Sequence, residues 1–498
     1  MNIAMALEMA ADAYGGRGAI AGPEGEVSYA SLRDRVERRA HALAEAAASV
    51  QAGNVAYLGL SGASFVEHLL GSAWAGLPFV PLNYRSKTDE LAPLLDPFRP
   101  VVLVHEETYA EKAEACAATG DVLITPDRTL AAEPDRAPYP ADPDALAIVL
   151  HTSGTTSRPK AVLLRHKHLC SYIFGTVEFA SAGADETAIV TTPPYHIAGI
   201  MGVLTPLYAG RRMVFLPQFD ALEWLLTAIA YDVTHAFVVP TMLARIVDAL
   251  TQDPALRPPS LRHVAYGGGP IHRSLVERAL RLFPGVDFVN AYGLTETSST
   301  VALLDPDDHR EALASSDPDV QARLGSVGRP LPGIEIRIVD ENGDELPPGE
   351  IGAITIAGPQ VSAHYHGSDA PAGMFATGDL GYVDSGGYLF VGSRSDDVII
   401  RGGENISPGE VEEAFTHHPD VRGIAVVGVP DEEWGQRVVA FVEPRSEAHA
   451  SEDELRAWVR SRGALAGFKI PESVVFVDEL PRTDTGKILR RRLRDGHA

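Results

Sequence analysis

Apolar positions recur at two alternating spacings along the first part of the chain. Residues 31–47 and 65–76 repeat them at helical spacing, whereas 55–60, 79–82 and 101–104 are short apolar runs typical of buried strands. Strands that alternate with helices in this way indicate βαβ units. The pattern therefore predicts largely parallel sheets covered by helices.

The pattern changes near residue 325. Residues 334–339, 351–356 and 388–391 alternate apolar with polar side chains, and an acidic turn at 340–344 follows the first of them. Alternation with period two is typical of antiparallel strands with one solvated face. The acidic turn lacks the ligand spacing and terminal Glu of an EF-hand loop, so we interpret the region as β-hairpins.

A smaller unit with mixed helical and strand patterns follows residue 394. We expect an α/β protein with a large N-terminal domain of αβ-layered sheets, which carries the β-hairpins as a subdomain, and a small mobile α+β lid domain. The predicted boundaries are 1–393 for the N-terminal domain, 394–396 for a hinge and 397–498 for the C-terminal lid domain.

Composition excludes several classes of protein. The chain has 498 residues, a formal net charge of -25 and a pI of about 5.1, which argues against a nucleic-acid-binding surface. Cys116 and Cys170 have no CxxC partner, so we expect neither disulfide nor zinc, and a reducing cytoplasm fits best. The first fifteen residues read as an amphipathic helix rather than a secretory signal, and no apolar stretch is long enough to insert into a membrane.

A loop rich in hydroxyl groups offers the first chemical signal. The apolar run 146–150 is followed by His151-Thr-Ser-Gly-Thr-Thr-Ser-Arg-Pro-Lys160. Hydroxyls and backbone N–H groups donate to phosphate oxygens, and a lysine adds a point charge, so this loop suits polyphosphate binding. It is not a Walker A loop, because the second Gly and the Ser/Thr after Lys are absent. Taken alone, it could also be an ordinary surface loop.

Other motifs, which follow one another in order along the chain, support a phosphate-binding role for this loop. Together they resemble the adenylate-forming (ANL) superfamily of acyl-CoA synthetases, aryl-CoA ligases, luciferases and the adenylation domains of peptide synthetases. The matching motifs are Pro194-Tyr-His196, Gly267-Gly-Gly-Pro270, Tyr292-Gly-Leu-Thr-Glu296, Thr377-Gly-Asp379, Gly392-Ser-Arg394, Gly402-Gly403-Glu-Asn405 and Pro481-Arg-Thr-Asp-Thr-Gly-Lys487.

The resemblance implies an AMP-forming acid–thiol ligase. A carboxylic acid would attack the α-phosphorus of ATP with Mg²⁺ present, pyrophosphate would leave, and CoA, as co-substrate, would take the acyl group and release AMP. Because anion attacks anion, such catalysis depends mainly on charge neutralisation and in-line positioning. The implied partners are the small acid, ATP and CoA; a homodimer is left open.

The resemblance also implies roles for residues at the ATP site. Glu296 would hold Mg²⁺, a hard cation that takes carboxylate, phosphate and water ligands, and Thr295 would contact the α-phosphate. Asp379, assisted by Arg394, would accept hydrogen bonds from the ribose hydroxyls. The β- and γ-phosphates would contact Thr152, Ser153, Gly154, Thr155, Thr156 and Lys160. Tyr292 would stack on adenine, near Gly268, Gly269, Asn290, Ala291 and Gly293.

Family members turn the small domain between an adenylating and a thioester-forming pose. By resemblance, Lys487 would reach the α-phosphate and the substrate carboxylate in the first pose. Asp396 matches the hinge position. Gly402 and Gly403 would approach the pantetheine arm of the acceptor. His196 resembles the aromatic gate between the acid pocket and the acceptor tunnel.

The expected acid pocket is small-walled and mostly neutral. No Arg follows Thr297, so a malonate-type second carboxylate is disfavoured, and an aryl ring or a medium-length chain is favoured. The residues expected to line it are Tyr195, His196, Ile197, Ala198, Gly202, Val239, Gly267, Gly268, Thr297, Ser298 and Ser299.

Departures from the family pattern concern the acceptor most. Pro217-Gln218-Phe219 and Gly402 occupy places where some members carry a lysine, in the first case for a CoA phosphate. The alternative hypotheses are an adenylating enzyme whose acceptor is a carrier-protein thiol or an amine, a relative that activates nitrite and diazotises an aromatic amine, and a non-catalytic acyl- or nucleotide-binding relative. The segment 363–376 is also short and lacks the family's Trp, which puts ATP affinity in question.

Overall fold

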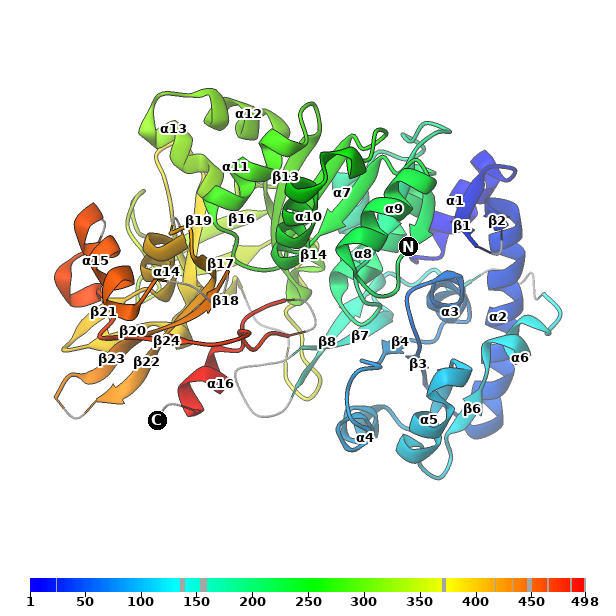
Figure 1. Ribbon diagram of the computed structural model, residues 1–498. Helices are drawn as coiled ribbons and strands as arrows, with labels where there is room; N and C mark the ends of the chain where they lie inside the picture. The colour runs from blue at the N-terminus through cyan, green and yellow to red at the C-terminus, as the bar shows by residue number, and fades with distance from the viewer. Residues whose placement is uncertain are drawn as a thin grey trace.

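The computed structural model describes residues 1–23, 25–134, 139–152, 159–369, 373–416, 418–431, 433–445, 450–463, 465–483 and 486–496. These residues form a large N-terminal domain, which occupies the right and centre of Figure 1, and a smaller C-terminal domain at its left.

One sheet of the N-terminal domain carries the predicted phosphate loop at its edge. Its strand order is β6-β5-β3-β4-β7-β8, and all neighbours are parallel except β7 and β8. The long apolar runs of β3, β5 and β7 are buried, as expected for parallel strands covered on two faces. The strands are β3 (Asn54–Leu58), β4 (Phe79–Pro81), β5 (Val101–His105), β6 (Val122–Ile124), β7 (Leu146–Thr152) and β8 (Lys160–Arg165).

The second, larger sheet has the order β15-β14-β13-β12-β11-β9-β10-β1-β2. Its middle strands are parallel and its two ends are antiparallel. The strands are β1 (Gly18–Gly22), β2 (Gly25–Ser28), β9 (Thr187–Val190), β10 (Arg212–Phe215), β11 (His235–Val238), β12 (His263–Gly267), β13 (Asp287–Leu294), β14 (Ser299–Leu304) and β15 (Arg329–Pro330).

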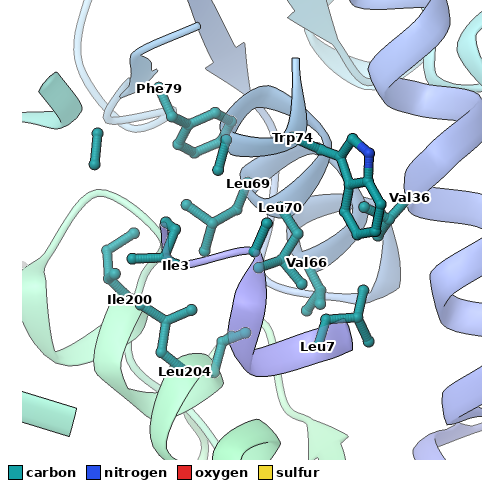
Figure 2. Packing of buried hydrophobic residues seen from close by; sticks show 14 of the residues in the cluster. Ile3, Leu7, Val36, Val66, Leu69, Leu70, Trp74, Phe79, Ile200 and Leu204 are labelled. Atoms are coloured by element: carbon teal, nitrogen blue, oxygen red, sulfur yellow. The ribbon is translucent and has the colours of Figure 1, made fainter. Parts of the chain in front are cut away.

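Helices fill the space between these sheets and cover their outer faces. Figure 2 shows Val66, Leu69 and Leu70 of α3 packed among side chains from α1, α2 and α8. The helix α3 is buried along most of its length, and its polar residues Glu67, His68 and Ser72 are buried together with its apolar ones. The helices of this domain are α1 (Met5–Tyr14), α2 (Tyr29–Val50), α3 (Ala63–Trp74), α4 (Thr88–Leu95), α5 (Ala110–Cys116), α6 (Pro126–Leu130), α7 (His166–Thr176), α8 (Ile197–Ala209), α9 (Ala221–Ala230), α10 (Pro240–Gln252), α11 (Arg273–Leu282), α12 (Pro306–Ala314) and α13 (Pro318–Ala322).

The hairpin region forms its own antiparallel sheet, as the period-two pattern predicts. Its strands follow one another in the order β16-β17-β18-β19 and are antiparallel throughout. Their inward side chains form a separate core with residues of β14. The strands are β16 (Glu335–Val339), β17 (Gly352–Ala357), β18 (Phe375–Val383) and β19 (Leu389–Arg394).

The C-terminal domain has a core of its own. Buried residues of α14, α15, β22 and β23 pack together, so this domain is held by its own apolar contacts. Its elements are β20 (Ile399–Arg401), β21 (Glu404–Ile406), α14 (Pro408–Thr416), β22 (Val421–Asp431), β23 (Gly435–Pro444), α15 (Glu452–Arg462), β24 (Ser473–Phe476) and α16 (Arg490–Asp495).

The architecture confirms the predicted α/β class with a smaller C-terminal domain. Cys116 and Cys170 are both buried free thiols. Burial raises the pKa of the Cys170 thiol to about 11, so it is kept protonated. Within the described ranges, we find no helix with the length and apolar character that a membrane span requires.

Candidate active site

The predicted phosphate loop joins two antiparallel strands. Thr152 at the end of β7 pairs with Lys160 at the start of β8, so the loop leaves and re-enters the sheet at one point. Lys160 is exposed beside this opening. The predicted phosphate contacts Ser153, Gly154, Thr155 and Thr156 lie outside the described residues. The structure therefore describes only the two ends of the loop, at Thr152 and Lys160.

Residues 361–368 form a strap that joins this hairpin to Glu296. The backbone N–H groups of Ser362 and Ala363 donate to the Glu296 carbonyl oxygen at 2.9 and 3.1 Å. The N–H of Leu163, on β8, donates to the carbonyl oxygen of His364 at 2.8 Å. These bonds hold the predicted metal ligand and the β7–β8 hairpin in one framework.

Tyr365, which the sequence reasoning did not identify, lies at the centre of this strap. Its hydroxyl donates to Glu296 Oε1 at 2.8 Å, and the Lys160 ammonium lies 5.2 Å from its ring centroid. Burial and the Glu296 charge raise the pKa of Tyr365, so the hydroxyl remains a donor at neutral pH. Tyr365 therefore contacts both charged groups that flank the expected phosphate position.

The donor set around Glu296 fits Mg²⁺. Among the described residues, no three His, Cys, Asp or Glu side chains cluster into a preformed cage. Mg²⁺ commonly binds through one or two carboxylates together with substrate phosphates and water. Glu296 is half-buried, and its Oε1 already accepts from Tyr365, which orients the carboxylate.

Asp379 lies at the point where β18 and β19 meet. Arg394 is its cross-strand partner and places Nε 2.8 Å from Asp379 Oδ1, while the Tyr292 hydroxyl donates to Oδ2 at 2.7 Å. Arg394 also donates to the Thr377 carbonyl oxygen at 2.9 Å. Burial and the Asp379 carboxylate raise the pKa of Tyr292. The structure therefore brings together three residues predicted for the nucleoside.

In the region predicted to contact adenine, the backbones of two strands lie close together. Gly267 on β12 pairs with Ala291 on β13, and a Cβ at Gly267 would fall 2.1 Å from the Ala291 carbonyl oxygen. Gly268 follows with a φ of +81°, which favours glycine. The Asn290 side chain is buried and donates to the Ser326 carbonyl oxygen at 3.0 Å, so its amide is engaged in the fold. The predicted contacts with adenine at Gly269, Asn290 and Gly293 remain predictions.

Lys487, from the C-terminal domain, shares the electrostatic environment of this site. Its side chain keeps contact with solvent. Even so, desolvation by the surrounding protein and the charge of Arg394 lower its pKa, while Asp379 and Asp397 oppose the shift. Lys487 and Arg394 are 93 positions apart in the sequence (487 − 394), yet each lies within the electrostatic reach of the other. The domain arrangement brings the predicted catalytic lysine to the predicted ribose carboxylate.

Two contacts define this domain arrangement. His272 Nδ1 of the N-terminal domain lies 3.0 Å from Glu413 Oε2 of α14. Gly486, with a φ of +78°, approaches Thr241 so closely that a Cβ would lie 2.1 Å from Thr241 Oγ1. A cavity of about 710 Å³ remains between the two domains, and Lys487 lines it.

The predicted acid pocket contains one hydroxyl that forms a hydrogen bond and one that forms none with a described residue. The rings of Tyr195 and His196 lie 4.6 Å apart, and His196 precedes the first turn of α8, where Ile197 and Ala198 follow. The Thr297 hydroxyl donates to the Ser299 carbonyl oxygen at 2.7 Å, so it has a structural partner. The Ser298 hydroxyl is buried, and no described residue contacts it through a hydrogen bond.

Three other predicted positions lie outside the cavity that Lys487 lines. Gly402 and Gly403 form the turn between β20 and β21, with φ values of +59° and +87°. A Cβ at Gly402 would lie 3.1 Å from the Trp434 ring. Asp396, the predicted hinge, is exposed in the 3-10 turn Ser395–Asp397 directly after β19. Their roles toward the acceptor and in domain motion remain predictions.

Two matches to known families cover most of the chain. Residues 7–366 match the family described as AMP-binding enzyme, and residues 410–487 match the AMP-binding enzyme C-terminal domain. The chain belongs to the AMP-binding enzyme family. This confirms the resemblance to adenylate-forming enzymes and the prediction of an AMP-forming ligase.

Relatives of this AMP-binding enzyme are similar over nearly their full length. Feruloyl-CoA synthase from Amycolatopsis sp is 38% identical over 94% of this chain and 93% of its own. The fatty acid--[acyl-carrier-protein] ligase ScoC from Streptomyces coeruleorubidus is 33% identical over 94% of this chain and 91% of its own. The names of these two relatives differ in the acceptor.

Solved structures of MatB from Rhodopseudomonas palustris resemble this AMP-binding enzyme in two states. ATP-bound MatB has a TM-score of 0.88 at 30% identity, covering 100% of this chain and 99% of MatB. Apo MatB covers the same shares at 29% identity with a TM-score of 0.77. The overall arrangement of this AMP-binding enzyme is therefore closer to that of the ATP-bound relative.

Proposed function

We propose that the chain activates an aryl or medium-chain carboxylic acid as an acyl-adenylate and transfers the acyl group to CoA. The products are acyl-CoA, AMP and pyrophosphate. One observation carries this proposal: Lys487 of the C-terminal domain lies in the electrostatic environment of the Asp379–Arg394 pair of the N-terminal domain. A cation delivered to the nucleotide site by a separate domain is suited to an attack of one anion on another.

Charge neutralisation explains the proposed roles at the phosphates. Lys160 would contact the β- and γ-phosphates, and Thr295 and Lys487 would bind the α-phosphate. Mg²⁺, when bound through Glu296, would neutralise phosphate charge and help to fix the triphosphate. Tyr365 keeps the Glu296 carboxylate oriented toward the side of Lys160.

The nucleoside role of Asp379 requires an exchange of partners. Asp379 now accepts from Arg394 and Tyr292, one on each oxygen. A ribose would replace the Tyr292 hydroxyl as donor and release the ring to stack on adenine. Arg394 would remain and hold the carboxylate in place.

The domain units belong to the same proposal. Residues 1–393 form the AMP-binding domain, 394–396 the hinge and 397–498 the lid, which would turn about Asp396 after adenylation. The closer agreement with ATP-bound than with apo MatB supports an adenylating arrangement for the structure described above.

The class of acid is inferred from the pocket walls and from a relative. A Cβ at Gly202 would lie 3.4 Å from Val190. The predicted pocket wall at Gly202 is therefore closely packed, and its side chain is small. The relative named feruloyl-CoA synthase acts, by its name, on an aryl acid. The name of this relative favours an aryl acid.

For the acceptor of the acyl group, there is a specific alternative to CoA. The CoA ligase relative supports CoA, whereas ScoC is named for an acyl-carrier-protein acceptor. The absence of a lysine from residues 217–219 favours the alternative. A cytoplasmic location and a homodimer remain predictions.

Acid-dependent exchange of labelled pyrophosphate into ATP tests the first half-reaction. We expect exchange with aryl acids such as ferulate, weaker exchange with medium-chain acids and none with malonate. Normal ATP binding without exchange for any acid would contradict the proposal and favour a non-catalytic binding protein.

Product analysis tests the second half-reaction. The wild-type chain is given the best acid with CoA, with a phosphopantetheinylated carrier protein or with an amine. We expect the CoA thioester as the main product. Good exchange together with a product on the carrier protein or amine alone would replace CoA with that acceptor.

A further inference from the structure

Lys487 lies on a turn whose backbone bonds to itself. The N–H of Leu489 donates to the Pro481 carbonyl oxygen at 2.7 Å, and the N–H of Thr483 donates to the Lys487 carbonyl oxygen at 2.7 Å. The N–H of Lys487 donates to Thr483 Oγ1 at 3.1 Å. These bonds set the shape of the turn, but they do not attach it to the rest of the C-terminal domain.

Arg490 attaches the Lys487 turn to α14. It follows the turn directly, as the first residue of α16. Its Nη2 donates to Glu412 Oε1 at 2.6 Å and to Glu412 Oε2 at 2.8 Å. The side chains of Arg490 and Glu412 are only 12% and 5% exposed. Because both are shielded from solvent, salt screens their attraction much less than that of a surface pair.

Glu412 and α16 are each held by β22 as well. Glu412 Oε1 also accepts from the N–H of Val426, on β22, at 2.8 Å. Leu493 of α16 is buried in a core with Ala425 and Val427 of the same strand. The segment that follows Lys487 is therefore anchored to both α14 and β22.

A second carboxylate connects Arg490 with the predicted hinge. Asp397 Oδ2 lies 3.7 Å from Arg490 Nη1, and Asp397 Oδ1 lies 3.9 Å from Arg494 Nη2. Asp397 directly follows Asp396, the predicted hinge residue. Arg490 therefore links the start of the C-terminal domain to the turn that carries Lys487.

The charge of Arg490 also reaches Lys487. Desolvation and the charge of Arg394 lower the pKa of Lys487, and the charge of Arg490 adds to this. Asp379 and Asp397 oppose the shift. Loss of the cation at position 490 should therefore raise the pKa of Lys487.

We propose that Arg490 positions Lys487 for adenylation, by fixing to Glu412 the turn that carries the lysine. A displacement of about 1 Å at a catalytic group can slow a reaction about 100-fold. The long lysine side chain is flexible and does not define such a position by itself, so the backbone beneath it must be held.

The effect of Arg490 is confined to one half-reaction. Arg490, Glu412 and Asp397 all belong to the C-terminal domain, so they move together with Lys487 when the domain turns. Adenylation uses Lys487, whereas transfer of the acyl group to the acceptor does not. This inference rests on the proposed role of Lys487 in adenylation.

Two substitutions at position 490 test the proposal in the full-length chain. Arg490→Gln removes the cation, and acid-dependent pyrophosphate exchange should slow about 10- to 100-fold. Arg490→Lys keeps a cation, but its single nitrogen replaces the separate nitrogens that face Glu412 and Asp397, so exchange should slow about 3- to 10-fold. Attack of CoA on a supplied acyl-adenylate should stay within about twofold of wild type in both variants.

Arg491→Gln is the matched control. Arg491 is the next residue of α16, its side chain is 69% exposed, and its ion pair with Asp495 lies within the same helix. Exposed pairs of this kind contribute little, so exchange should stay within about twofold of wild type.

A double variant addresses the stability of the fold. Arg490→Gln leaves the buried Glu412 carboxylate without its cation, which destabilises a domain. Arg490→Gln combined with Glu412→Gln removes both charges and keeps an amide oxygen for the N–H of Val426. If the two residues act as one unit, the double variant should exchange pyrophosphate about as fast as Glu412→Gln alone.

The pH profile of exchange gives a readout that domain stability alone would not change. Exchange should decline at alkaline pH as Lys487 loses its proton. In Arg490→Gln the decline should move to higher pH, because the neighbouring cation no longer opposes protonation of Lys487. In Arg490→Lys, which keeps the cation, the decline should stay at the wild-type pH.

Three results would overturn the positioning role of Arg490. The first is an exchange rate in folded Arg490→Gln equal to that in Arg491→Gln. The second is an equal loss in both half-reactions. The third is an alkaline decline that lies at the same pH in Arg490→Gln as in wild type.

A failure of the proposed function would look different. Exchange in Lys487→Ala as fast as in wild type would show that Lys487 has no role in adenylation. Slow exchange in Lys487→Ala, together with equal rates in the Arg490→Gln and Arg491→Gln variants, would refute the positioning role of Arg490 alone.

Discussion

The two walls of the nucleotide site are held in different ways. On the N-terminal side, Asp379 and Arg394 are cross-strand partners, and Glu296 is fixed by backbone bonds from the strap at 361–368. On the C-terminal side, Lys487 reaches the site through domain contacts such as the His272–Glu413 pair. The difference suggests a preassembled binding wall and a cation that a movable domain delivers.

Removal of the delivered cation should have the largest effect. Lys487→Ala is expected to slow acid-dependent pyrophosphate exchange by about 10²- to 10³-fold, the usual effect of losing one group that stabilises transition-state charge. Attack of CoA on a supplied acyl-adenylate should be nearly unaffected. Equal loss in both half-reactions would show that Lys487 does not act specifically in adenylation.

A change in the preassembled wall should act on binding. Asp379→Asn removes the charge that Arg394 and Tyr292 contact, and hydrogen bonds to charged groups contribute about 1.5–3 kcal/mol. We expect KM for ATP to rise about 10- to 100-fold. Asp384→Asn, in the turn that follows β18, is the control, since its backbone contacts suit an amide oxygen. An unchanged KM would contradict the role of Asp379.

The pH dependence should report the delivered lysine. Lys487 must be protonated to neutralise phosphate, and its pKa is lowered by desolvation and by Arg394. The exchange rate should therefore begin to fall at a lower pH than for a lysine of ordinary pKa, about tenfold per pH unit once above it. In Lys487→Arg the alkaline decline should move to higher pH, because a guanidinium stays charged. An identical profile in both proteins would assign the decline to another group.

Tyr365 should have a smaller effect on metal dependence. Tyr365→Phe loses a hydrogen bond to Glu296 worth about 0.5–3 kcal/mol, but keeps the ring beneath Lys160. We expect weaker binding of Mn²⁺·ATP, measured by electron paramagnetic resonance, by about 2- to 10-fold. Tyr382→Phe, whose ring stacks on Phe390, is the control. Equal affinities would show that Glu296 is oriented without Tyr365.

The weakest effect is expected at the domain contact itself. Glu413→Gln removes an exposed pair with His272, and such pairs contribute up to about 1 kcal/mol. A distance probe across the two domains should show that the equilibrium between the arrangement described here and arrangements without this contact shifts by at most about fivefold. Glu410→Gln on the same helix is the control, because its partner Lys469 lies within the C-terminal domain. Equal shifts would point to a general effect of charge.

Local signals in the sequence predicted the elements of both domains. The helical spacing at 31–47 and the alternation at 334–339 agree with α2 and β16, because hydrophobic burial on one face sets both periods. The ordered motifs predicted that Asp379, Arg394 and Lys487 belong together. The period-two runs predicted β16, β17 and β19 of the hairpin sheet, whereas no such run marked β18.

Contacts between distant segments had no such signal. Tyr365 meets Glu296 across 69 residues, and His272 meets Glu413 across 141. A tyrosine in a short segment or a glutamate on a surface helix has no local pattern that reveals its partner. The same holds for Arg245 and Arg482, which line one cavity although they lie on separate domains.

Because Gly486 approaches Thr241 so closely, the residue type at position 486 affects which arrangement of the two domains is possible. A methyl group at 486 would collide with Thr241 in this domain arrangement and would be free of that collision once the domains separate. The hydrogen atom that Gly486 has in place of a methyl group thus permits the close approach of the two domains at this point. Gly486→Ala is expected to disfavour this domain arrangement and also to strain the backbone at its φ of +78°. Thr241→Ala in the same chain should remove the collision but leave the backbone strain.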